Sequence, residues 1–242
     1  MPSHRPSLDE FRQLASGYSR VPVYRELTSD GLTPVSAFRR LARSGPAFLF
    51  ESVVGGEKVG RYSALGTEPS LRFEAKGSEI RLYRGTETEP CETRVSEDPF
   101  VDLQALLDQR RSVKLPNLPR FTGGAVGFAA YDSVRYTENL PDAPPDDRSL
   151  PDLAFGFYDS LVIFDHIRKT VLVIAQADCS DGRDVDLARA EAESRVDELV
   201  GRLSEPFADP PPSDIDTTGP ITLQPKSNFT REQYEDVVRR CQ

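Results

Sequence analysis

The side chains best suited to bind a small ligand lie in one short segment, residues 51–63. An apolar run precedes the segment and a second one follows it, which predicts a strand, a polar loop and another strand. The segment offers a carboxylate, hydroxyls, two cations and a phenol, from Glu51, Ser52, Lys58, Arg61, Tyr62 and Ser63. These groups complement a small zwitterion, because Glu51 would pair with its ammonium and Lys58 or Arg61 with its carboxylate. The alternative is a glycine-containing hairpin loop whose charges are solvated.

A glycine cluster at residues 123–127 is the second candidate. Such clusters can cradle a phosphate, but this one lacks the Lys-Ser/Thr pair of a P-loop and the full dinucleotide-binding fingerprint. Small residues also let a strand backbone lie close to a neighbouring element. We predict such a close approach here, and no nucleotide site.

The remaining reactive residues form no recognised catalytic or metal-binding pattern. His4 and His166 are isolated, and His166 is expected to be solvated in a turn. The three cysteines lack Cys-x-x-Cys spacing, so neither a disulfide framework nor a zinc site is indicated. We therefore assign no catalytic residue and no metal ligand to these 242 residues.

The composition restricts the class of partner. The chain has a formal charge of −9 and a pI of about 4.9, whereas binding to nucleic acid or to an anionic membrane needs a positive surface. Its apolar runs are too short to span a bilayer, and its first ten residues lack the apolar core of a signal peptide. We expect a cytoplasmic globular protein that binds neither nucleic acid nor membrane.

Capping signals and apolar periodicity predict five helices. Ser7 with Glu10, and Thr230 with Gln233, have the spacing of a capping box. The other helices are predicted to begin at Pro34 after Thr33, to begin at Asp98-Pro99, and to span residues 181–204.

The strands are predicted to pair as antiparallel hairpins. Residues 71–84 alternate around a central turn, and residues 160–175 contain two almost wholly apolar runs, typical of a hairpin buried on both faces. Residues 21–26 contain Pro22 and are predicted to be an edge strand or a strand start, and residues 139–152 are predicted to be a surface loop. The predicted fold class is α+β, with largely antiparallel sheets in a layered, sandwich-like arrangement and helices outside.

The C-terminal part has the composition of a linker followed by a helix. Residues 205–226 are rich in proline, and the helix after them has an apolar face with no later segment to pack on. We therefore expect residues 1–204 to form one domain, residues 205–226 a linker, and residues 227–242 the first helix of a truncated domain.

Three parts of the sequence resemble one family of enzymes. Leu49-Phe50-Glu51-Ser52 and Gly60-Arg61-Tyr62-Ser63 are similar to the Leu-Leu-Glu-Ser and Gly-Arg-Tyr-Ser elements in the N-terminal region of anthranilate synthase component I. Residues 121–132 resemble the family's Gly-Gly-x-Val-Gly-Tyr…Tyr-Asp element, with Phe128 in place of the first tyrosine. Residues 227–234 resemble the start of its catalytic domain. The matches follow the family's order over most of the chain.

The resemblance implies a role in tryptophan biosynthesis. The complete subunit in this family converts chorismate into anthranilate and pyruvate, with Mg²⁺ and with ammonia from a glutamine amidotransferase subunit, component II. The catalytic and Mg²⁺-binding carboxylates belong to the subunit's own C-terminal catalytic domain, which would lie beyond residue 242. We therefore expect this chain to be inactive alone.

The resemblance also implies feedback inhibition by L-tryptophan, bound near the Glu-Ser element and against the C-terminal domain. By their match to the family's motifs, Glu51 and Ser52 are the leading candidates for tryptophan binding, and Arg61, Tyr62 and Ser63 are weaker candidates. Lys58 is a carboxylate partner by its chemistry alone.

We retain two alternatives. Aminodeoxychorismate synthase component I, from the folate pathway, shares the Gly-Gly-x-Val-Gly element, although the pairing of Glu-Ser with Gly-Arg-Tyr-Ser favours the tryptophan enzyme. A non-catalytic amino-acid-binding or assembly module would also fit the sequence.

Overall fold

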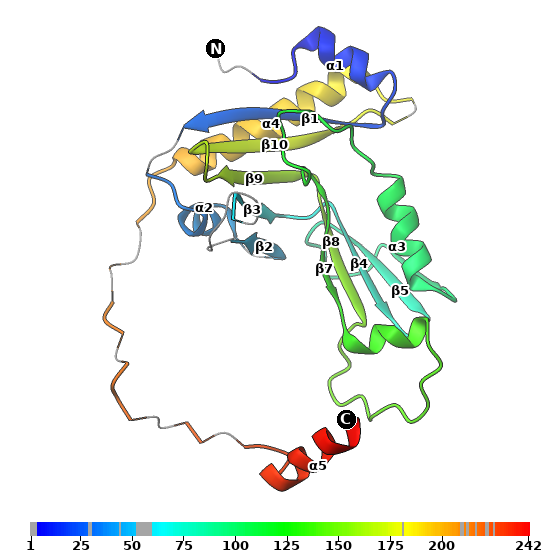
Figure 1. Cartoon of the computed structure of the whole chain (residues 1–242). Coiled ribbons are helices and arrows are strands. Elements are labelled where there is room, and N and C mark those ends of the chain that lie inside the picture. The colour runs from blue at the N-terminus through cyan, green and yellow to red at the C-terminus, as the bar shows by residue number, and fades with distance from the viewer. Residues whose placement is uncertain are drawn as a thin grey trace. The chain divides into compact units, whose positions relative to one another are not determined.

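The computed structural model describes residues 4–28, 31–43, 45–51, 60–180, 182–208, 211, 213–215, 217–220, 223–224 and 226–242. The chain divides into two compact units, Met1–Phe207 and Ala208–Gln242 (Figure 1). Of the residues first proposed to bind a ligand, Ser52 and Lys58 lie outside the described residues.

The larger unit contains two five-stranded antiparallel sheets (Figure 1). In spatial order, the first sheet consists of β1 (Arg20–Thr28), β10 (Thr170–Asp178), β9 (Ser160–Asp165), β3 (Tyr62–Thr67) and β2 (Ala47–Phe50). The second consists of β6 (Glu92–Val95), β5 (Glu79–Arg84), β4 (Leu71–Lys76), β8 (Leu153–Tyr158) and β7 (Gly124–Ala129). Because β8 and β9 follow one another in the chain, Asp159 marks the crossing from one sheet to the other.

Helices cover one face of the first sheet and pack against the second. The helices on the first sheet are α1 (Leu8–Ala15), α2 (Pro34–Leu41) and α4 (Val185–Ser204), and α4 runs across β1 and β10 (Figure 1). Helix α3 (Pro99–Asp108) contributes Leu103 to the core of the second sheet, near the short 3-10 helix η1 (Tyr131–Tyr136). The fold class is therefore α+β with antiparallel sheets, as predicted.

Local capping explains where the helices begin. Ser7 and Glu10 make both hydrogen bonds of the predicted capping box at α1. The predicted helix at residues 181–204 begins later, at Val185, because the Asp184 side chain accepts a hydrogen bond from the amide of Leu187 and so caps the first turn.

The smaller unit contains one helix, α5 (Arg231–Cys241), among its described residues. Thr230 and Gln233 form the predicted capping box at its start. Three apolar side chains of the helix are exposed, those of Tyr234, Val237 and Val238.

The core of the first sheet is built around the β9–β10 hairpin. Val162 and Val173 face the helices, whereas Ile163 and Ile174 face a second cluster on the opposite side of the sheet. The two strands are thus buried on both faces, as predicted. Strand β1, which contains Pro22, has β10 as its neighbour in the sheet and forms an edge of it, as predicted.

The glycine cluster lies in β7 and lets two backbones approach closely. Gly127 is paired with Phe155 of β8, and a Cβ atom built at Gly127 would lie 1.9 Å from the carbonyl oxygen of Ala154. This confirms the predicted close approach. Sequence patterns did not predict β6, β8 or η1, whose short segments border loops rich in proline, glycine and charge.

Candidate functional site

Antiparallel pairing of β2 with β3 brings the two ends of the candidate ligand-binding segment, residues 51–63, to the same end of the first sheet. Phe50, the last residue of β2, is paired with Ala64 of β3. Glu51 follows directly and is exposed. The chain therefore leaves the sheet at the end of β2 and returns to it in the neighbouring strand β3. The Glu51 carboxylate is exposed to solvent.

The two predicted residues at the start of β3 have different environments because successive side chains of a strand point to opposite faces. Tyr62 packs against the cluster that contains Ile163, and the Arg61 guanidinium lies 4.8 Å from the centre of its ring. The Ser63 side chain belongs to the other face. A single small ligand on one face of the sheet therefore cannot contact both Tyr62 and Ser63.

Ser63 is only 1% exposed and is linked to a histidine from another hairpin. Its Oγ lies 2.7 Å from Nε2 of His166, with which it shares a hydrogen bond. His166 is half-buried, and its amide donates to the carbonyl oxygen of Arg61 at 2.9 Å. The prediction of a solvated His166 is therefore wrong: the turn folds back onto the start of β3.

Arg61 is paired with Asp165, the last residue of β9. The guanidinium approaches the carboxylate side-on, with Nη2 at 2.8 Å from Oδ2 and Nε at 3.2 Å from both oxygens. Oδ1 also accepts hydrogen bonds from the amides of Ile167 and Arg168, each at 3.1 Å. The Asp165 carboxylate, 4% exposed, thus has four N–H donors.

These contacts favour the ionised forms of both Asp165 and Arg61. Burial acts to raise the pKa of Asp165, but the hydrogen bonds from Arg61 and from the two amides outweigh it, and the pKa is lowered. The hydrogen bond to Asp165 raises the pKa of Arg61. The Nε–Nη2 edge of Arg61 is therefore engaged within the protein.

Sequence analysis missed Asp165 and His166 as neighbours of the segment. They lie 104 and 103 positions from Arg61 and Ser63, respectively, so no local spacing connects them. The available signal was an aspartate directly after an apolar strand, which is typical of a turn in which the carboxylate accepts hydrogen bonds from the following amides.

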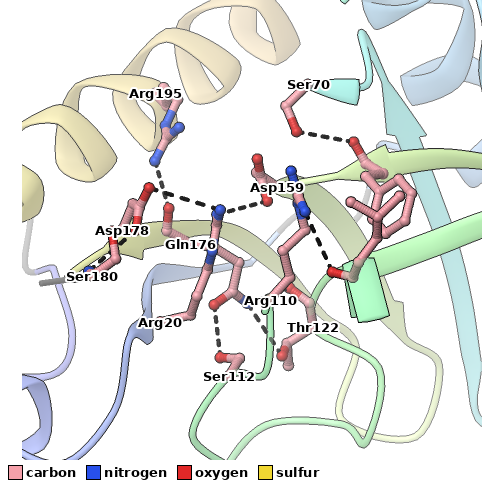
Figure 2. Close-up of polar contacts among 12 residues, drawn as sticks. Arg20, Ser70, Arg110, Ser112, Thr122, Asp159, Gln176, Asp178, Ser180 and Arg195 are labelled. Carbon is pink, nitrogen blue, oxygen red and sulfur yellow. Dashed lines mark hydrogen bonds and ion pairs between the residues drawn. The ribbon is translucent and has the colours of Figure 1, made fainter. Parts of the chain in front are cut away.

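A second polar cluster lies where the chain crosses between the sheets (Figure 2). Arg20 of β1 donates from Nη1 to Oδ1 of Asp159 at 2.9 Å, and its Nη2 lies 3.8 Å from Oδ2 of Asp178. The main-chain carbonyl oxygen of Asp159 also accepts a hydrogen bond from the main-chain amide of Gln176 in β10, at 2.7 Å. The cluster therefore fixes the corner between β8 and β9.

Gln176 is the centre of this cluster and is 3% exposed. Its side-chain oxygen Oε1 accepts a hydrogen bond from Ser112 Oγ at 2.7 Å, and its side-chain Nε2 donates to the Thr122 carbonyl oxygen at 2.7 Å. The main-chain carbonyl oxygen of Gln176 accepts from Arg195 Nη2 at 2.6 Å (Figure 2). Burial lowers the pKa of Arg195. Because protein partners occupy these groups, we interpret the cluster as structural rather than ligand-binding.

The described residues contain no group of three or more His, Cys, Asp or Glu side chains that could hold a metal ion. Among the same residues, no helix is long and apolar enough to cross a membrane.

Comparison with known proteins agrees with the motifs. Residues 45–242 match the family described as chorismate binding enzyme. The chain is 40% identical over 171 residues to anthranilate synthase component 1 of Acetivibrio thermocellus, which covers 70% of this chain and 34% of that protein. It is 34% identical over 238 residues to the same component of Pseudomonas putida, which covers 96% of this chain and 46% of that protein.

A solved structure is also similar. It is the crystal structure of anthranilate synthase component I from Streptococcus pneumoniae TIGR4, with 26% sequence identity and a TM-score of 0.48, covering 75% of this chain and 37% of that one. The chain spans between a third and a half of the length of the two curated relatives named above. Since the family match covers most of the sequence, the chain belongs to the chorismate binding enzyme family.

Proposed function

We propose that these residues are the N-terminal, tryptophan-binding part of an anthranilate synthase component I subunit. The complete subunit would convert chorismate and ammonia into anthranilate and pyruvate. Component II would supply the ammonia from glutamine. The observation that carries the proposal is the alignment with the Pseudomonas putida component, which covers 96% of this chain but only 46% of that protein. A regulatory part without the catalytic part is consistent with that coverage.

The described ends of the segment support different roles for Glu51 and Arg61. Glu51 is exposed at the end of β2 and is available to pair with the ammonium of tryptophan. Of the two cations in the segment, Arg61 is engaged by Asp165. We therefore assign the tryptophan carboxylate to Lys58, and Ser52 to a place beside the ligand.

The proposal also assigns a role to the C-terminal part of the chain. Residues 1–204 would form the regulatory domain, residues 205–226 a linker, and residues 227–242 the first helix of a catalytic domain. The exposed apolar side chains of α5 support this assignment, because such a face is stabilised by packing on further structure. The Mg²⁺ ion and the catalytic carboxylates would belong to that catalytic domain.

Anthranilate formation tests the proposal. We expect the 242-residue chain, given chorismate, ammonium and Mg²⁺, to form no anthranilate above a control without protein, and the complete subunit to form it and to be inhibited by tryptophan. Turnover by the 242 residues alone would contradict the proposed division. Release of aminodeoxychorismate by the complete subunit would favour the folate enzyme instead.

A further inference from the structure

The ion pair with Asp165 limits how Arg61, a residue of the Gly-Arg-Tyr-Ser element, can bind a ligand. A ligand carboxylate that approached the Nε–Nη2 edge of the guanidinium would have to compete with Asp165, because both atoms are directed at the Asp165 carboxylate. Winning the competition would leave Asp165, which is almost fully buried, without its cationic partner. Leaving a buried charge without its partner is unfavourable, so the fold opposes the exchange.

The contacts of Arg61 instead fasten the start of β3 to the β9–β10 turn. The two segments are joined three times within a few residues: by the Arg61–Asp165 ion pair, by the amide of His166 donating to the Arg61 carbonyl oxygen, and by the Ser63–His166 hydrogen bond. In the register of the sheet, Tyr62 is also paired with Asp165. The return of the chain into the first sheet is therefore held by side-chain as well as main-chain contacts.

We propose that Arg61 is a positioning residue of the ligand-binding segment, with Asp165 as its partner, and that it does not contact the ligand. This inference rests on the proposed function. The segment is anchored at one end by the pairing of Phe50 with Ala64 and at the other by Arg61. Fixing both ends reduces the conformational entropy lost on binding, which raises affinity without adding a contact to the ligand.

The effect of Asp165→Asn separates positioning from direct contact. If Arg61 bound the tryptophan carboxylate, removing the charge of Asp165 would free the guanidinium, and the affinity for tryptophan would rise or stay the same. If Arg61 positions the segment, Asp165→Asn and Arg61→Gln remove the same ion pair, and each weakens the affinity.

The experiment measures tryptophan inhibition of anthranilate formation by the complete subunit for wild type, Asp165→Asn, Arg61→Gln and the double variant. We expect each single variant to weaken tryptophan affinity about tenfold, and the double variant to be no weaker than either, because coupled residues are non-additive. Arg61→Lys, which keeps the charge, should recover part of the loss. Asp108→Asn, which breaks the exposed pair with Arg111 on α3, is the matched control and should leave the affinity unchanged.

Amide hydrogen exchange of the 242-residue chain provides a measurement that needs no tryptophan. The amides of Ile167 and Arg168 and those at the start of β3 should exchange faster in both single variants than in wild type. Unchanged exchange, unchanged or tighter tryptophan binding by Asp165→Asn, or additive losses in the double variant would overturn the positioning role. A wild-type subunit that tryptophan does not inhibit would overturn the proposed function, and the exchange comparison would still decide whether the pair fixes the start of β3.

Discussion

The Cα atom of Gly127 lies against the carbonyl group of Ala154, so closely that a Cβ atom at position 127 would be 1.9 Å from the carbonyl oxygen. This contact joins the glycine-rich element to β8, the strand that leads through Asp159 into the first sheet. The element thus has a packing role in the second sheet.

Gly127→Ala should therefore destabilise the protein. The added methyl group meets main-chain atoms, which cannot move aside as a side chain can, and overpacking of this kind costs about 1–3 kcal/mol or more. Urea unfolding should show the loss as a lower midpoint. Gly201→Ala is the matched control: the site lies in α4, and apart from the chain neighbours and the backbone of the helix itself no atom lies within 4 Å of the added Cβ, so this variant should gain about 0.4–1 kcal/mol. Equal stability of the two variants would contradict the close approach.

Limited proteolysis should begin in residues 205–225. Proline-rich polar segments with few packing side chains open at little cost in free energy, and most of the described residues there are exposed. Mass spectrometry of the first fragments identifies the cleavage sites. Initial cleavage within residues 160–175, the buried β9–β10 hairpin, would show that the proposed domain division is wrong.

Asp165 should contribute stability that disappears in acid. Its pKa is below the ordinary value of 3.8 in the folded protein, so its contribution is complete above about pH 4 and is lost as the pH falls through the folded pKa. Asp165→Asn should lower the free energy of unfolding at pH 7 by about 1 kcal/mol, because the bonds to the Ile167 and Arg168 amides lose their charge assistance. Urea unfolding of both proteins from pH 7 to pH 2 should show the two curves converging below pH 4. A constant difference would contradict the lowered pKa.

In the complete subunit, Ser52→Arg should abolish inhibition by tryptophan while anthranilate turnover changes far less. Ser52 directly follows Glu51 in the sequence, so an arginine there would fill space beside the ligand, compete for the Glu51 carboxylate and repel the ligand ammonium. Loss of one charge-assisted hydrogen bond costs about 1.5–3 kcal/mol, or roughly tenfold or more in affinity. Inhibition curves for the two proteins decide the matter. Superimposable curves would favour a plain surface loop, and a parallel loss of turnover would indicate a role in the fold or active site.

Features that depend on neighbours in the sequence were predicted correctly. The capping boxes at Ser7 and Thr230 join residues three positions apart, and the β4–β5 hairpin closes over a two-residue turn, so local patterns are sufficient. The burial of β9 and β10 on both faces was also predictable, because residues 161–164 and 171–175 are all apolar. The resemblance of the motifs to anthranilate synthase component I identified the family before any tertiary contact was known.

The role of the motif residues depended on contacts that no local pattern encodes. Sequence reasoning offered Arg61 as a free cation, since its partner Asp165 is 104 positions away and the carboxylate could equally have been solvated. Ser63 and His166 are likewise joined only because antiparallel pairing of β3 with β9 places the start of one strand beside the turn that follows the other. Tertiary structure therefore decided which charged groups remain available to a ligand, because a side chain's partner is set by which strands lie side by side and not by its position in the chain.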